Sequence, residues 1–192
     1  MYKYIIFIAI FFISCGHPDY RYPHVIIDTG LGEIELELYQ EKAPKTVAAF
    51  LSNTDAGLYT SGSFYRVLKS EEFPTDFNTG LIQGGTWKIS DQQHVSLPGI
   101  THESTKQSGL SHTDGIVSMA RQDTGTATTE FFICIGDQSF FDFARNGNPD
   151  GQGFAAFGKV FKGMDIVRKI QSQNSLGDKF EKRIEIISIK KL

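Results

Sequence analysis

Residues 24–39 read HVIIDTGLGEIELELY and predict a β-hairpin. From 33 to 38, glutamate occupies every odd position, and isoleucine or leucine occupies every even position. Strict alternation of this kind is typical of a strand with one buried face, and the glycines at 30 and 32 supply the turn. The glutamate face is most simply a solvated sheet surface.

Short apolar runs continue this β pattern along the chain. We expect further strands at 63–68, 81–83, 115–120, 130–135, 154–160 and 183–189. The last run changes phase at Ile187, for which a β-bulge is one explanation. Two helices are expected, at 43–55 and at about 164–171, while 87–114 is expected to be largely loop. Several strands with a helix near each end indicate an all-β domain, a closed barrel capped by two helices.

The composition suits one globular domain with a short leader. The chain has 192 residues, of which 40% are hydrophobic, and this is enough for a core. Its net charge of −3 and the lack of a basic block argue against nucleic acid as the main partner. Zinc, P-loop and Gly-x-Ser-x-Gly signatures are missing, and 146–151 lacks the glutamate that closes a calcium loop. We therefore expect no metal and no cofactor.

Residues 1–14 (MYKYIIFIAIFFIS) are expected to be a signal peptide. Their apolar run is too short to span a hydrocarbon core of about 30 Å, but it suits the h-region of an exported protein. The following Ser14-Cys15 pair resembles a bacterial lipobox, so Cys15 is the expected lipid acceptor and 15–23 a tether. The protein is then expected in the cell envelope, attached to a bacterial membrane and facing the periplasm. A plain signal peptide with a chance cysteine, or an uncleaved anchor, are the alternatives.

The second cysteine, Cys134, lies in the apolar run 131–135. Two cysteines exclude a disulfide framework, although a single bridge is not excluded. An apolar strand is typical of a buried, inert thiol, and we expect that state for Cys134.

Six segments, taken in chain order, together resemble the cyclophilin family of peptidyl-prolyl cis-trans isomerases. They are 42–47 (KAPKTV), 63–67 (SFYRV), 83–85 (QGG), 115–120 (GIVSMA), 130–133 (EFFI) and 154–163 (FAAFGKVFKG). The resemblance covers nearly all of 23–192, so the expected isomerase domain is 24–192. It implies the family's eight-stranded antiparallel barrel closed by two helices, and proline-containing polypeptides as substrates. We also expect a monomer.

The implied reaction is rotation about an Xaa-Pro bond, whose barrier of about 18–20 kcal/mol is lost amide resonance. A donor aimed at the lone pair of the twisted prolyl nitrogen stabilises the transition state more than either planar state. By resemblance that donor is Arg66, and Gln83 orients it and binds the substrate backbone. A surface arginine in an ion pair is the other interpretation of Arg66.

The same resemblance implies a set of substrate-binding residues. They are Tyr65, Leu81, Ala120, Arg121, Glu130, Phe132, Phe140, Phe141 and Phe154. Phe132 resembles a wall of the proline pocket, and the other apolar members line it, although core packing also explains them. Ala120 and Arg121 resemble the edge that pairs with the substrate backbone.

Several positions depart from the family pattern. Tyr65 stands where members often carry His, Glu130 replaces the usual Gln, and Phe140 stands where some members carry Trp. The connection 69–80 looks longer than usual, and Gly80 stands at the place of a pocket phenylalanine. Because of these departures, a second function remains an alternative: a non-catalytic module that binds proline-containing segments as a chaperone or assembly factor. An unrelated small-ligand β-barrel is a third interpretation.

Overall fold

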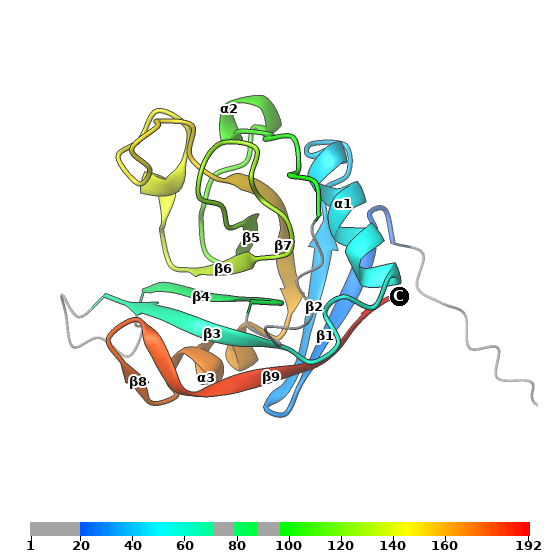
Figure 1. The fold of residues 1–192 in the computed structure, drawn as a ribbon, viewed down its shortest axis with the longest axis vertical. Helices are drawn as coiled ribbons and strands as arrows, with labels where there is room; N and C mark the ends of the chain where they lie inside the picture. The colour runs from blue at the N-terminus through cyan, green and yellow to red at the C-terminus, as the bar shows by residue number, and fades with distance from the viewer. Residues whose placement is uncertain (1–19, 71–78, 88–96) are drawn as a thin grey trace, which may run out of the picture.

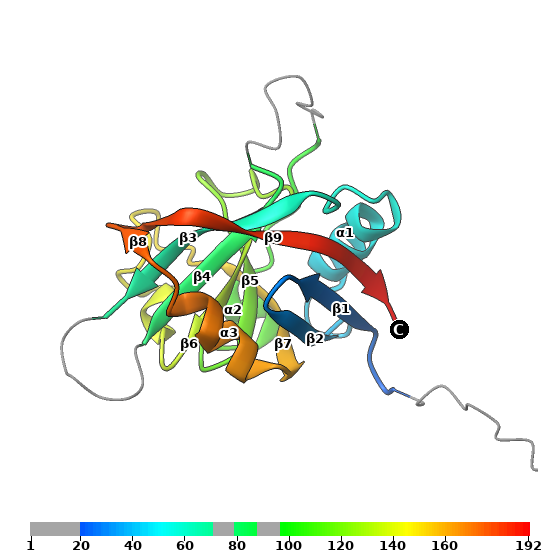
Figure 2. The ribbon, with the colours of Figure 1, turned by 90° about the horizontal axis from the view of Figure 1, so that it is seen from below.

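The strands form one antiparallel sheet that closes on itself (Figure 1 and Figure 2). The computed structural model describes residues 20–70, 79–87 and 97–192. Neighbouring strands follow the order β1-β2-β7-β5-β6-β4-β3-β9, and pairing of β1 with β9 completes the ring. A ninth strand, β8, has two residues and pairs with β9. The expected eight-stranded antiparallel barrel is therefore confirmed.

The elements match the expected ones closely. The strands are β1 (His24–Thr29), β2 (Gly32–Leu38), β3 (Gly62–Lys69), β4 (Gly80–Gly85), β5 (Ile116–Met119), β6 (Phe131–Ile135), β7 (Ala155–Lys162), β8 (Ser175–Leu176) and β9 (Lys179–Lys191), and the helices are α1 (Pro44–Asp55), α2 (Thr105–Ser108), α3 (Met164–Gln171) and the 3₁₀ turn η1 (Ser139–Phe141). The two expected helices are α1 and α3, and the structure adds the four-residue helix α2 within 87–114, which was expected to be largely loop. No helix in these described ranges is long and apolar enough to cross a membrane. The predicted signal peptide, Cys15 and the tether up to residue 19 lie outside the described residues.

The two longer helices complete the core of the barrel. Phe50 of α1 is fully buried, with its ring centroid 5.7 Å from Phe131 of β6 and 5.1 Å from Phe157 of β7. Val167 and Ile170 of α3 are buried in the same apolar cluster. Each of the two helices thus buries one apolar face against the strands of the barrel.

A carboxylate from a distant loop caps helix α1. Its first residues offer unpaired N–H groups, and the capping position, Ala43, has no side chain that could accept them. Glu103 accepts hydrogen bonds from the backbone N–H groups of Lys45 and Thr46 at 3.1 and 2.8 Å, and from the Thr46 hydroxyl at 2.7 Å. The loop that follows residue 96 is thereby tied to the barrel.

The phase shift in the last strand is a β-bulge. Asp28 pairs with Ser188, but the next residue, Thr29, pairs with Ile186, so Ile187 has no partner in β1. Its side chain is 47% exposed, while Ile186 and Ile189 are buried. The change of hydrophobic phase read from the sequence therefore reports a real insertion in the strand.

The interpretation of the glutamate face as solvated was wrong for Glu35. This carboxylate is buried, 2.7 Å from His24 Nδ1 and 2.9 Å from the ammonium group of Lys162. The ring of Tyr20 stacks on His24 with centroids 3.7 Å apart. The segment that leads into β1 thus covers this part of the sheet, which alternation within one strand could not reveal.

Candidate active site

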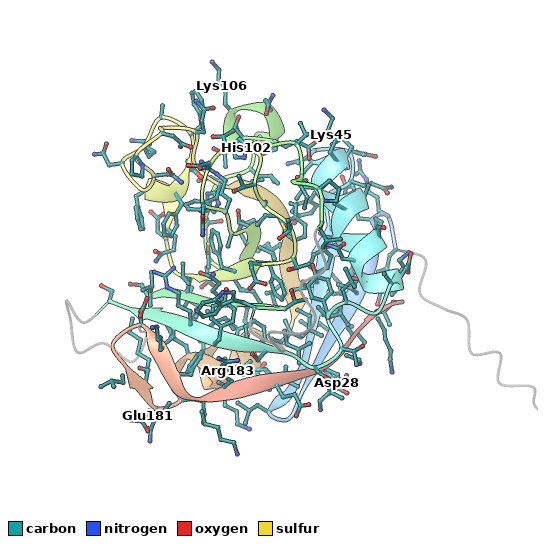
Figure 3. The ribbon with its side chains drawn as sticks, viewed as in Figure 1. Asp28, Lys45, His102, Lys106, Glu181 and Arg183 are labelled. Atoms are coloured by element: carbon teal, nitrogen blue, oxygen red, sulfur yellow. The ribbon has the colours of Figure 1, made fainter. Side chains whose placement is uncertain are left out.

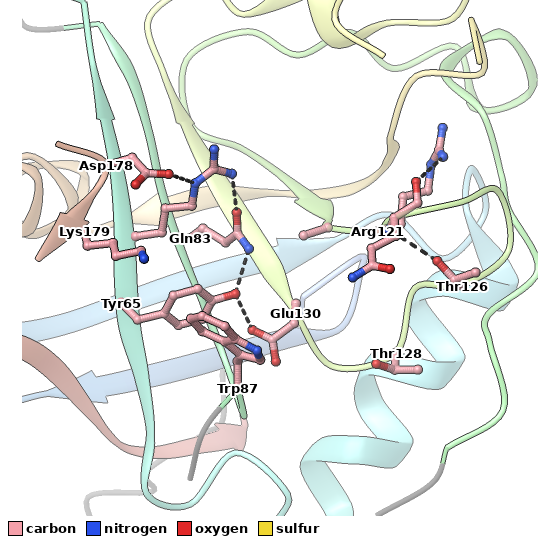
Figure 4. Close-up of a pocket in the computed structure, with 12 residues that line it drawn as sticks. Tyr65, Gln83, Trp87, Arg121, Thr126, Thr128, Glu130, Asp178 and Lys179 are labelled. Atoms are coloured by element: carbon pink, nitrogen blue, oxygen red, sulfur yellow. Dashed lines mark hydrogen bonds and ion pairs between the residues drawn. The ribbon is translucent and has the colours of Figure 1, made fainter. Parts of the chain in front are cut away.

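Arg66 and Gln83 meet because they are paired residues on neighbouring strands. Arg66 of β3 lies directly opposite Gln83 of β4 in the antiparallel register, and side chains so placed are in contact. The Nη1 group of Arg66 donates a hydrogen bond to Gln83 Oε1 at 3.1 Å. Its Nε group donates to the carboxylate of Asp178 at 2.8 Å. The guanidinium is thus held at two nitrogens (Figure 4).

A β-bulge at Tyr65 brings two consecutive side chains to one cavity. Phe64 pairs with Gly84 and Arg66 with Gln83, so Tyr65 is the extra residue in β3. Consecutive strand residues normally point to opposite faces, and a bulge re-aims one of them. Phe64 is fully buried in the core, while Tyr65 and Arg66 both line the same cavity.

Hydrogen bonds continue from Gln83 to a carboxylate (Figure 4). The Nε2 group of Gln83 donates to the Tyr65 hydroxyl at 2.7 Å, and that hydroxyl donates to Glu130 Oε2 at 2.7 Å. The other carboxylate oxygen accepts from the Thr86 N–H at 2.8 Å. Burial and the Glu130 charge hold the pKa of Tyr65 well above its usual range, so the phenol stays a donor. Burial also raises the pKa of Glu130, against the effect of these hydrogen bonds.

Gly85 provides the space for this carboxylate. A Cβ atom at this position would lie 2.6 to 2.7 Å from the carboxyl group of Glu130, and its φ of +147° lies in the region that favours glycine. Gly85, the second glycine of the Gln-Gly-Gly segment, is therefore required because a side chain at this position would clash with Glu130. It lets Glu130 rest against the backbone of β4, where the Thr86 N–H reaches it.

These side chains border a cavity of about 500 Å³. It is lined by Tyr65, Arg66, Gln83, Trp87, Ala120, Arg121, Gln122, Thr126, Thr128, Glu130, Asp178 and Lys179. The residues come from β3, β4, the segment around 120–130 and the turn between β8 and β9. The lining therefore combines three cationic side chains, Arg66, Arg121 and Lys179, with two carboxylates, several neutral polar groups and the exposed ring of Trp87.

The predicted apolar residues gather in a second cluster beside the cavity. Leu81, Phe132 and Phe141 are buried together, with Phe154 and Ala120 packed against them. The ring centroid of Phe132 is 5.6 Å from that of Phe141 and 5.4 Å from that of Phe154. Ala120 also lines the cavity, so it joins the two regions.

Two predicted residues are placed differently. Phe140 is 48% exposed, contacts Phe141 with ring centroids 4.0 Å apart and planes tilted by 33°, and does not line the cavity. The side chain of Arg121 is 1% exposed and binds the Asp150 carboxylate through both terminal nitrogens, at 2.7 and 2.9 Å. It also donates to the Gly153 carbonyl. This side chain holds two loops together, so only the backbone of Arg121 remains for the predicted substrate edge.

Cys134 is fully buried and free, as expected from its apolar strand. Burial raises the pKa of its thiol well above the usual range, which keeps the sulfur uncharged. Among the described residues, no three His, Cys, Asp or Glu side chains form a group that could hold a metal ion.

Asp178 is a site residue that sequence reasoning missed. It lies in the two-residue turn Gly177-Asp178 between β8 and β9, and Gly177 has a φ of +59°. Glycine at the first central position is typical of such hairpin loops. The Gly-Asp pair was a detectable turn signal, but its contact with Arg66 spans 112 positions along the chain.

The family model for the cyclophilin type peptidyl-prolyl cis-trans isomerases matches residues 24–191. Peptidyl-prolyl cis-trans isomerase A of Dickeya dadantii (strain 3937) is 35% identical over 148 residues, which cover 77% of this chain and 70% of that protein. Peptidyl-prolyl cis-trans isomerase B of Escherichia coli (strain K12) is 34% identical, with coverage of 77% and 83%.

Solved structures agree on the fold. The crystal structure of a cyclophilin type peptidyl-prolyl cis-trans isomerase from Cryptosporidium parvum superposes with a TM-score of 0.69. It covers 89% of this chain and 98% of its own, at 21% sequence identity. At this level of identity the likeness concerns the fold alone.

Proposed function

The chain belongs to the cyclophilin family of peptidyl-prolyl cis-trans isomerases, and we propose that its catalytic donor is Arg66, oriented by Gln83. The observation that carries this proposal is the double anchoring of the guanidinium in the wall of an open cavity. An arginine in a simple surface ion pair would need only the contact with Asp178. Here the paired strand supplies a second anchor through Gln83.

The anchored guanidinium still has donors to offer. Arginine carries five N–H hydrogens, and the hydrogen bonds to Asp178 and Gln83 use one on Nε and one on Nη1. Within the described residues, the Nη2 hydrogens have no hydrogen-bond partner. A prolyl nitrogen regains its lone pair only when the amide is twisted, so a donor waiting there binds the transition state selectively.

The apolar cluster beside the cavity is the proposed seat of the proline ring. Phe132, Leu81 and Phe141 present apolar surface next to Ala120, which borders the polar cavity. Holding the ring there while the preceding carbonyl turns near Arg66 would confine rotation to one bond. Such positioning lowers the barrier further, because the reacting groups are held in place beforehand.

We further propose that the substrates are exported polypeptides and that a lipid on Cys15 holds the enzyme to a bacterial membrane. The support comes from the sequence of residues 1–15, an apolar h-region followed by Ser14-Cys15. Uncatalysed Xaa-Pro isomerisation takes tens to hundreds of seconds, which makes it a slow step in folding. An isomerase near the site of export would act on chains as they fold.

The second candidate is a module that binds proline-containing segments without catalysis. It is favoured by Gly80, where a Cβ atom would lie 2.1 Å from the Leu68 carbonyl oxygen. This position therefore has no room for the aromatic side chain implied by the family pattern.

One experiment separates the two candidates. The purified protein is added to a refolding protein whose slow phase is limited by proline isomerisation, and to a control protein without a slow proline phase. An enzyme accelerates the first at substoichiometric concentration and leaves the second unchanged. A binding module changes the refolding rate only at stoichiometric concentration, or retards it.

A further inference from the structure

We propose that Asp178 is a positioning residue for Arg66, and that it sets the orientation in which the guanidinium meets the substrate. Its Oδ2 accepts a hydrogen bond from the Arg66 Nε group at 2.8 Å. The inference rests on the proposed role of Arg66 as the catalytic donor. It adds a residue from the β8–β9 turn to a site otherwise built from β3, β4 and the segment around 120–130.

The fold brings Asp178 to this place through a second register shift. Phe64 pairs with Ile184 of β9, but Arg66 pairs with Lys179, so residues 180–183 of β9 lie between two pairs that in β3 are separated by Tyr65 alone. The N–H group of Val67 donates to the Asp178 carbonyl at 2.9 Å. The backbone of the turn is therefore fixed to β3 directly beside Arg66, and the carboxylate needs no long flexible side chain to reach it.

Orientation, and not stability, is the effect expected of this ion pair. The side chains of Arg66 and Asp178 are 40% and 45% exposed, and pairs this accessible to water contribute little to the free energy of unfolding. A planar guanidinium held at one nitrogen can still turn about that contact. A second contact on Nε removes this freedom and holds Nη2, whose hydrogens neither contact uses, in one position.

The charge of Asp178 makes the opposite result possible. The negative charge of Asp178 also partly neutralises the positive charge of Arg66. This would weaken the attraction between Arg66 and the lone pair that develops on the prolyl nitrogen of the substrate. If this were the larger effect, removing Asp178 would accelerate the reaction. The sign of the change therefore decides between a positioning carboxylate and an inhibitory one.

The test uses Asp178→Ala, Asp178→Asn and a matched control, Glu181→Ala. Glu181 is an exposed carboxylate two residues after the same turn-strand junction, and it points away from the barrel in Figure 3. We expect Asp178→Ala to lower kcat by about tenfold with little change in KM, as misplacement of a catalytic group does. Asp178→Asn keeps an acceptor for the Nε hydrogen and should recover part of the rate. Glu181→Ala should match the wild type.

Two further measurements show whether the effect passes through Arg66. In an Arg66→Ala background, Asp178→Ala should cause no additional loss, because the group that it positions is gone. The Arg66 Nε–H signal in a ¹H–¹⁵N NMR spectrum should shift in Asp178→Ala and stay in place in Glu181→Ala. Thermal melts should agree for all single variants.

The outcomes separate this inference from the proposed function. If Arg66→Ala lowers the rate but Asp178→Ala leaves it equal or higher, the positioning role is wrong and the catalytic role of Arg66 stands. An additive loss in the double variant would also overturn the positioning role. If Arg66→Ala is as fast as the wild type, the proposed site itself is wrong.

Discussion

The hydroxyl group of Tyr65 lies 2.7 Å from the carboxylate of Glu130, to which it donates a hydrogen bond. An ionised carboxylate can only accept, so the phenol must donate to it and use a lone pair toward Gln83. That choice turns the Nε2 group of Gln83 to Tyr65 and its Oε1 atom to Arg66. The charge on Glu130 thereby fixes the amide orientation that the proposed donor requires.

Replacing Glu130 with glutamine should stabilise the protein at neutral pH. Burial raises the pKa of Glu130 in the folded state, whereas a glutamate in the unfolded chain has a pKa of about 4.3. The folded protein therefore binds the proton more tightly. The stabilising contribution is complete below the unfolded value and is lost as the pH rises through the folded-state value.

Glutamine resembles the protonated form, so Glu130→Gln should raise the free energy of unfolding at pH 7. The difference from the wild type should shrink toward pH 4. Urea denaturation at both pH values measures it. A variant less stable than the wild type at pH 7 would show that the hydrogen bonds to the carboxylate outweigh its desolvation.

Tyr65→Phe should slow the reaction and leave the fold intact. Without the phenol, the Nε2 group of Gln83 loses its acceptor, so the amide is held only by its contact with Arg66, and the Glu130 carboxylate loses one of its donors. We expect the refolding rate enhancement to fall by roughly threefold to tenfold, and stability to fall by about 1–3 kcal/mol. Tyr39→Phe, which removes the same atom away from the cavity, is the control. An unchanged rate in Tyr65→Phe would show that the hydrogen bonds from Gln83 through Tyr65 to Glu130 do not contribute to catalysis.

Glu103→Ala should destabilise the protein without affecting catalysis. The variant leaves two N–H groups at the start of α1 and the Thr46 hydroxyl without their acceptor. Losing a helix cap together with a negative charge at the helix N-terminus costs about 2 kcal/mol. Glu103→Gln keeps one acceptor oxygen and should lose less. Equal melting temperatures for the wild type and Glu103→Ala would contradict the capping role.

Cys15→Ser tests the proposed anchor. The wild-type protein, expressed in a bacterium, should fractionate with membranes and carry lipid-modified Cys15 in mass spectrometry. The serine variant should accumulate unprocessed or appear in the soluble fraction, because serine has no thiol that could form a thioether to the lipid. A soluble, unmodified wild type would exclude the lipid and leave a plain signal peptide as the alternative.

Most of the barrel could be predicted from the sequence because its signals are local. Alternation marked β2, a single stripe marked α3, and the phase change at Ile187 marked a bulge. Strand β8 was missed because two residues carry no periodicity. The burial of Glu35 was not predicted because the residues that cover it, His24 and the Tyr20 ring stacked on it, lie outside β2, the strand whose alternation was analysed.

The site could be predicted only in part, for a related reason. Arg66 and Gln83 were identified by family resemblance, and their pairing agrees with it. The contacts that orient them depend on register shifts at Tyr65 and in β9, which arise from pairing between distant strands. Asp178 therefore could not be found by reading along the chain. Phe140, which was expected in the substrate set, is 48% exposed and lies outside the cavity lining, whereas Leu81, Phe132, Phe141 and Phe154, also outside it, form the apolar cluster beside it.

The central claim is that Arg66 supplies the donor, and the rate of proline-limited refolding with Arg66→Ala and Arg66→Lys tests it most directly. Removing one preorganised donor typically costs about 10²- to 10³-fold in rate, and we expect Arg66→Ala to lose about that much. Arg66→Lys keeps the charge but lacks the planar fork that binds Asp178 and Gln83 together, so it should recover only part of the rate. Thermal melts should confirm that both variants are folded. Equal rates for the wild type and a folded Arg66→Ala would contradict the account and favour the binding module.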